Sequence, residues 1–112
     1  ALLIGGIGSV DAANWYTVGT DSNGVTWSID NDSVKKDDKK AVMDIKAMDY
    51  EGYHYIVTEE FNHKKREVKD LKVTLYNPQG YVVKEEQVNK NSRKVEPGTP
   101  AYAVFQLIWG GK

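Results

Sequence analysis

Four aspartates lie close together in the run from Asp30 to Lys40, and carboxylates at short spacing are ligands that calcium prefers. An EF-hand calcium loop needs oxygen ligands at its first, third and fifth positions and glycine at its sixth. Counted from Asp30, the fifth position is Val34 and the sixth is Lys35, so this pattern fails. Lysines in the same run oppose a cation, whereas aspartate and asparagine favour turns by bonding to the backbone. We therefore predict a solvated turn here and no metal site.

Other reactive groups are few and are poorly spaced for catalysis. The chain has no cysteine, which excludes thiolate catalysis, disulfides and cysteine-ligated zinc. His54 and His63 are its two histidines, fewer than the three protein ligands of a catalytic zinc site. No G-x-S-x-G motif occurs, and neighbours such as Glu59 and Glu60 point to opposite faces of a strand. We predict no catalytic residue and no cofactor; a hydrolase assembled from distant residues is the least favoured alternative.

Two groups of residues remain as candidates for binding a partner. Tyrosine occurs seven times and tryptophan three times, and aromatic side chains with a polar tip are favoured at recognition surfaces. A basic triplet could hold an acidic protein or a polyanion such as heparan sulfate. The alternatives are packing across strands for the tyrosines and a solvated loop for the triplet. The candidate partner-binding residues are Tyr53, Tyr55, Tyr76, Tyr81, Lys64, Lys65 and Arg66.

Composition narrows the class of protein. The 112 residues are 40% hydrophobic and 28% charged, which is typical of one globular domain. Fifteen basic residues against 16 acidic ones give a net charge of −1, which argues against a nucleic-acid partner. No stretch reaches the roughly twenty apolar residues of a membrane helix, so we predict that the protein is not integral to a membrane.

The N-terminal string ALLIGGIGSVDAA has the features of a secretory signal. A small, apolar, glycine-rich run leads to Val10 and Ala12, which fit an A-x-A-like cleavage site. We interpret residues 1–13 as the remnant of a signal peptide or a flexible arm, and residues 14–112 as one α+β domain. The protein is therefore expected to be exported, to the periplasm, the cell surface or the extracellular space.

Beyond residue 13 the hydrophobic pattern has a period of two, which is typical of half-buried strands. Asn23 and Gly24 predict a two-residue hairpin loop, and the turn from Asn77 to Gly80 predicts a second hairpin. Residues 62–70 are expected to be a polar connection. Six strands are predicted, at 14–19, 25–30, 40–49, 53–61, 71–76 and 81–88.

The C-terminal segment changes to a helical period. Thr99 fits an N-cap, Pro100 the first helical position and Gly110 the residue beyond the end. A helix of about ten residues is unstable alone, so it must pack on the sheet. The apolar face comprises Ala101, Val104, Phe105 and Ile108, widened by Leu107 and Trp109. The predicted fold is α+β: a single antiparallel sheet of about six strands with one C-terminal helix packed on a face.

Several short motifs follow one another in an order that is typical of one family of exported bacterial proteins. They are Ile29 with Asp30 after a glycine turn, Arg66, the hairpin from Tyr76 to Val83, and Pro97 with Gly98 before the helix. With them, the segment from about Trp15 to Trp109 resembles the surface-adhesin protein E family. Members commonly carry cysteines where this chain has Asn62 and the pair Ile108 and Trp109. The resemblance implies that those cysteines are bridged in such members and that hydrophobic contact between helix and sheet replaces the disulfide here.

The resemblance also implies a function. It indicates an exported, non-enzymatic binding domain of the bacterial surface or envelope that contacts host matrix or envelope proteins. The alternative is a periplasmic small-ligand-binding or envelope-maintenance domain with a pocket between helix and sheet, lined by Trp27, Tyr53 and Tyr55. Open strand edges also allow a homodimer.

Overall fold

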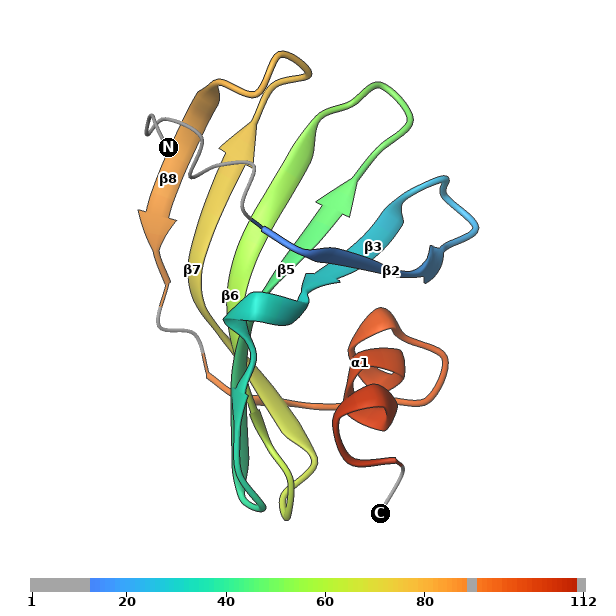
Figure 1. Cartoon of the computed structure of the whole chain (residues 1–112), viewed down its shortest axis with the longest axis vertical. Coiled ribbons are helices and arrows are strands. Elements are labelled where there is room, and N and C mark those ends of the chain that lie inside the picture. Colours follow the sequence, from blue (N-terminus) through green and yellow to red (C-terminus); the bar gives the residue numbers. More distant parts are fainter. Residues whose placement is uncertain (1–12, 89–90, 111–112) are drawn as a thin grey trace.

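The computed structural model describes residues 13–88 and 91–110, and its main feature is an antiparallel sheet curved around one helix (Figure 1). The sheet follows the order β2-β3-β5-β6-β7-β8, with β4 beside β5 and β9 beside β7. The predicted signal remnant, residues 1–13, lies outside the described residues except for Ala13. The α+β prediction is confirmed.

The elements have the following bounds. The strands are β2 (Trp15–Thr20), β3 (Thr26–Asp30), β4 (Lys35–Lys36), β5 (Lys40–Met48), β6 (His54–Asn62), β7 (Glu67–Tyr76), β8 (Val82–Gln87) and β9 (Arg93–Lys94). The helices are the 3₁₀ turn η2 (Asn31–Ser33) and α1 (Pro100–Trp109). The six strands of the main path correspond to the six predicted ones. β4 and β9 have two residues each, too few to show a hydrophobic period.

The start of β7 differs from the prediction. The polar connection expected at 62–70 is shorter, because β7 begins at Glu67 and Val68 is a buried residue opposite Phe61. Charged residues surround Val68 in the sequence, so a single apolar position did not reveal the strand period.

The core lies between one face of the sheet and α1. Alternate residues of β5 and β6 point to this face, as the pleat of a strand requires. The buried apolar residues are Ile29, Ala41, Met43, Ile45, Phe61 and Val68 of the sheet with Val104, Phe105 and Ile108 of α1. Leu107 does not widen the buried face as predicted: it is 49% exposed. Val104, Phe105 and Ile108 are buried, which matches the prediction that α1 covers the sheet.

Both ends of α1 are as predicted. The Thr99 side chain accepts a hydrogen bond from the Tyr102 N–H (3.2 Å), and Pro100 opens the helix. Gly110 ends it with a φ of 66°, a left-handed conformation that glycine adopts without a Cβ penalty. The helix therefore begins and ends where its sequence dictates.

Non-covalent contacts hold the end of α1 to the sheet. The Trp109 ring stacks on His63 with 4.3 Å between centroids, and its Nε1 donates to the Asp37 carbonyl (3.1 Å). Lys36 Nζ donates to the Ile108 carbonyl (2.8 Å), where a cation also offsets the negative end of the helix dipole. These contacts join the last turn of α1 to β4 and to the two neighbouring loops.

The reversal between β2 and β3 is a four-residue turn that begins at Asp21, not the predicted two-residue loop. Asp21 Oδ1 accepts hydrogen bonds from the N–H groups of Asn23 (2.9 Å) and Val25 (3.1 Å). Gly24 completes the turn with a φ of 82°. The carboxylate of Asp21 decides the turn type, because it bonds both N–H groups that the reversal exposes.

The same turn recurs after β5 and after β7. Asp49 Oδ1 accepts from the N–H groups two and four residues later (2.9 and 3.1 Å), and Asn77 Oδ1 does likewise (3.0 and 2.9 Å). Gly52 and Gly80 take positive φ values of 96° and 89°. The predicted tight turn from Asn77 to Gly80 is therefore confirmed, and three equivalent turns close three hairpins.

Replacing Gly52 is expected to destabilise the middle turn. A Cβ at Gly52 would lie 3.1 Å from the Pro78 Cβ, and the positive φ costs an L-residue about 1–2 kcal/mol. We expect Gly52→Ala to lower the free energy of unfolding by at least that amount in urea titrations. The matched control is Gly19→Ala, where a Cβ meets nothing within 4 Å. An equal loss in both variants would contradict the assigned turn geometry.

Candidate functional site

The two candidate groups lie at opposite ends of the sheet. Because neighbouring strands are antiparallel, the β2–β3, β5–β6 and β7–β8 turns share one end, which we call the turn end. The loops that join β4 to β5 and β6 to β7 share the other, which we call the basic end (Figure 1). Tyrosines gather at the first and the Lys64–Arg66 triplet lies at the second.

The turn end presents exposed tyrosines. Tyr50, inside the middle turn, is 85% exposed, and Tyr81 is 71% exposed. Tyr53 and Tyr81 occupy equivalent positions, each directly after the glycine of its turn. They lead into β6 and β8, which are two strands apart and thus separated by about 10 Å. Of the predicted tyrosines, these two are brought to one end, together with Tyr50.

The other two predicted tyrosines lie on opposite faces of the sheet. Tyr55 pairs with Leu75 on the face that α1 partly covers, and it remains exposed. Tyr76 is on the other face, where its ring stacks on His54 with 5.0 Å between centroids. His54 Nδ1 also donates to the Gly52 carbonyl (3.0 Å), so this stack supports the middle turn. The four tyrosines therefore do not form one surface.

The three turns lie side by side. A Cβ built on Gly24 would be 3.9 Å from the Tyr50 ring, and Gly52 lies against Pro78. Trp27 Nε1 donates to Asp21 Oδ2 (3.1 Å); this bond and the Val25 N–H hold the pKa of Asp21 below its ordinary value. The turn end is consequently held in one shape by bonds within the chain.

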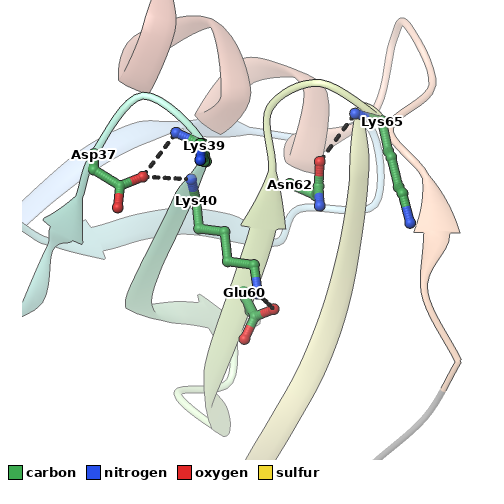
Figure 2. A network of polar contacts seen from close by, with 6 residues as sticks. All are labelled: Asp37, Lys39, Lys40, Glu60, Asn62 and Lys65. Carbon is green, nitrogen blue, oxygen red and sulfur yellow. Dashed lines mark hydrogen bonds and ion pairs between the residues drawn. The ribbon is translucent and has the colours of Figure 1, made fainter.

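The basic end consists of two loops that the fold brings together. His63 N–H donates to the Lys39 carbonyl (2.9 Å), and His63 Nδ1 donates to the Asp38 carbonyl (2.9 Å). Figure 2 shows both loops, with Asp37 and Lys65 on either side. The guanidinium of Arg66 lies over the Phe105 ring at 5.3 Å, so that it is directed toward α1. Lys64 and Lys65 remain exposed as predicted candidates.

A third cluster was missed at the sequence level. Arg93 Nη2 lies 3.0 Å from Glu59 Oε2, and Arg93 Nη1 lies 3.2 Å from Asp70 Oδ1. Glu59 is 8% exposed and pairs in register with Asp70. Burial, and then the neighbouring Asp70 carboxyl, raise the pKa of Glu59 to about 8, although Arg93 opposes the shift. The pair therefore shares one arginine and holds a proton at neutral pH.

An open hollow of about 570 Å³ lies beside this pair, between α1 and the sheet. Its lining includes Trp27, Val57 and Pro100. The predicted pocket between helix and sheet exists in this form, but neither Tyr53 nor Tyr55 lines it, because both lie nearer the turn end. Its acidic and basic groups come from β6, β7 and β9 and from Glu96 after β9, so no local motif identifies them.

Within the described part of the chain, no three His, Asp or Glu side chains come together in a way that would hold a metal ion. The aspartate run instead caps backbone: Asp30 accepts from the Asn14 and Asp32 N–H groups (2.9 and 3.0 Å). None of the helical segments in residues 13–88 and 91–110 has the length and apolar character that a membrane crossing requires.

An open antiparallel sheet closed by one helix, with exposed tyrosines at one end, defines a small α+β domain with surfaces suited to binding. The chain belongs to the surface-adhesin protein E family, whose family model matches residues 15–108. This membership implies an adhesin-like protein of the cell surface. No curated protein and no solved structure gave a match.

Proposed function

We propose that this chain is a non-enzymatic, exported binding domain whose turn end recognises a protein of the host matrix or of the bacterial envelope. Family membership supports the adhesive role. The observation that carries the choice of surface is the exposure of Tyr50 and Tyr81, 85% and 71%, on turns that are already locked. Large exposed aromatic groups on a rigid support are a feature of recognition surfaces.

Tyrosine suits this role for a physical reason. It contributes a large contact area and a hydroxyl while losing only two side-chain rotations on binding. Since side-chain carboxylates and an amide fix the turns, little backbone entropy is lost when a partner docks. Val82 and Val83 are more than half exposed and directly follow Tyr81 along β8. They extend the apolar part of the surface down the sheet edge.

The charge of the turn end indicates the complementary partner. Asp21, Asp49 and Glu51 belong to its turns, whereas segments 20–25, 48–53 and 77–81 contain no lysine or arginine. A partner with basic residues around an apolar centre would complement this surface and would associate faster at low salt.

Removal of two tyrosines tests the proposal. The double variant Tyr50→Ala/Tyr81→Ala should lose about 30-fold or more in affinity, since truncating even one hot-spot aromatic costs about 2 kcal/mol or more. Binding of the full chain to immobilised matrix, plasma and envelope proteins is measured by biolayer interferometry. The control is Tyr16→Ala, which removes a tyrosine 48% exposed on β2. Equal losses in control and double variant would exclude the turn end.

The proposal includes the domain limits. We propose that residues 14–112 form one domain and that residues 1–13 belong to an export signal. The single core shared by sheet and α1 supports the first part, and the apolar run before Asp11 supports the second. A homodimer through open strand edges is compatible with the exposed strand β8.

The hollow beside Glu59 favours a second candidate function, binding of a small ligand. It joins an apolar wall to a carboxyl pair, a combination that is typical of ligand sites. Native mass spectrometry of the protein isolated from its own cells tests this function. A mass above that of the denatured chain would support a bound ligand, and identical masses would exclude one that survives isolation.

A further inference from the structure

We propose that the basic end binds a linear sulfated polysaccharide of the heparin type. The two loops would act as one surface, taken as segments 35–40 and 63–66 so that Lys35, Lys36 and Lys40 of the flanking strands are included. Both the ligand and the binding surface differ from those of the proposed protein recognition, which is assigned to the turn end. The choice of a sulfated polysaccharide among polyanions rests on the proposed location of the protein at the cell surface, where such chains are a component of the host matrix.

The first support is the joining of two loops that are distant in the sequence. His63 bonds to the carbonyls of both Asp38 and Lys39, each at 2.9 Å, and its ring stacks on Trp109. Asn62 Oδ1 accepts from the Lys65 N–H (2.9 Å), which shapes the second loop (Figure 2). The two loops are therefore held in a fixed relation, which brings their cations to the same end of the sheet.

The second support is the concentration of positive charge. The two loops contain six lysines and one arginine against two aspartates, which gives a net charge of +5 in a chain of net charge −1. A patch of one sign raises the local concentration of anionic ligands and their association rate. Because much of the opposite charge lies outside these two loops, the overall composition conceals this concentration of cations.

The third support is that several of these cations are available. Asp37 forms no ion pair with these lysines among the described residues; its Oδ1 instead accepts from the backbone N–H groups of Lys39 (2.7 Å) and Lys40 (2.9 Å). Lys40 lies 3.7 Å from Glu60 (Figure 2). Among the described residues, the exposed side chains of Lys39, Lys64 and Lys65 take part in no ion pair.

The shape of the patch favours a sulfated polymer over other anions. The lysines come from two separate loops, so a single small anion would meet few donors, whereas a polymer can contact several ammonium groups in turn. Single-stranded nucleic acid needs free aromatic faces for base stacking. Here the Trp109 ring already stacks on His63 and meets Phe105 edge to face. A polymer with repeated sulfate groups, each able to contact a lysine ammonium group, therefore fits this surface best.

The test uses the full chain and a heparin dodecasaccharide in isothermal titration calorimetry. Lys64→Gln/Lys65→Gln is expected to weaken binding by about fivefold to twentyfold, and Lys39→Gln by about twofold to fivefold, as single exposed charge contacts contribute little each. Within the part of the chain that the structure describes, no hydrogen bond or ion pair involves these three side chains, since Lys39 and Lys65 bond through backbone atoms, so we expect the variants to fold. The control Lys72→Gln/Lys84→Gln removes the same charge from β7 and β8 and should bind like the wild type.

Lys39→Gln is the decisive variant, because only the folded structure places Lys39 beside the basic triplet. Unchanged affinity in this variant would overturn the two-loop surface. An equal loss in the β7–β8 control, or no binding at 50 mM salt, would overturn the site. Binding to vesicles of anionic lipid, without binding to heparin, would contradict the assigned ligand. Because Tyr50→Ala/Tyr81→Ala should keep its heparin affinity, failure here is separable from failure of the proposed protein recognition.

Discussion

Phe105→Ala is expected to lower the free energy of unfolding by about 3–5 kcal/mol, the range for truncating a buried aromatic side chain. Phe105 is fully buried at 0% exposure. Its ring meets Trp109 at 4.9 Å and His63 at 5.7 Å between centroids. The substitution therefore removes the main contact between α1 and the sheet and also loosens the stack that joins the helix to the basic end. Chemical denaturation at constant pH measures the loss.

The matched control for Phe105 lies on the same helix. Leu107→Ala truncates a side chain that is 49% exposed, so its effect should stay within about 0.5–1 kcal/mol. If Phe105→Ala unfolds at the same denaturant concentration as Leu107→Ala, α1 does not seal the core as described.

The second large effect is a loss of stability as the pH rises from about 4.5 to 8. Glu59 has an ordinary pKa of 4.5, which the fold raises to about 8 through burial and the nearby Asp70 carboxyl. Between these two values the folded chain holds a proton that the unfolded chain has released, so raising the pH favours unfolding. Each unit of pKa difference corresponds to about 1.4 kcal/mol. Stability should fall progressively from about pH 4.5 to pH 8 by several kcal/mol.

Glu59→Gln isolates this contribution. The amide resembles the protonated carboxyl, can accept from Arg93 and can donate to Asp70, and it does not ionise. The variant should lose most of the pH dependence and should exceed the wild type in stability above pH 8. Unfolding free energies measured from pH 5 to pH 9 give the comparison. Parallel curves for the two proteins would show that Glu59 is not the group responsible.

The sequence was sufficient to predict the fold where local chemistry determines it. Thr99, Pro100 and Gly110 set the ends of α1, because capping and positive φ depend on residues adjacent in the chain. The period-two pattern predicted strand β5 for the same reason, and Met43 and Ile45 lie on its buried face. The position of α1 on the sheet followed, since a helix this short and apolar must cover something.

The candidate surfaces were predicted only in part, because their assembly depends on strand register. Glu59 was compared with its neighbour Glu60, but its true partner is Asp70 in the next strand, where pairing skips one residue at a bulge. Lys39 joins the basic triplet through loop contacts across 24 residues of sequence. Residue type identified the tyrosines as candidates. Only the pairing of β6 with β7 shows that Tyr55 and Tyr76 lie on opposite faces of the sheet.

The most direct test of the turn end as the recognition surface is a nuclear magnetic resonance titration. The labelled chain is titrated with a matrix, plasma or envelope protein that it retains. We predict shifts or broadening confined to residues 21–24, 49–53 and 77–83, with residues 63–66 unchanged. Perturbation that spares these turns, or the absence of any retained protein at micromolar concentration, would contradict the assignment.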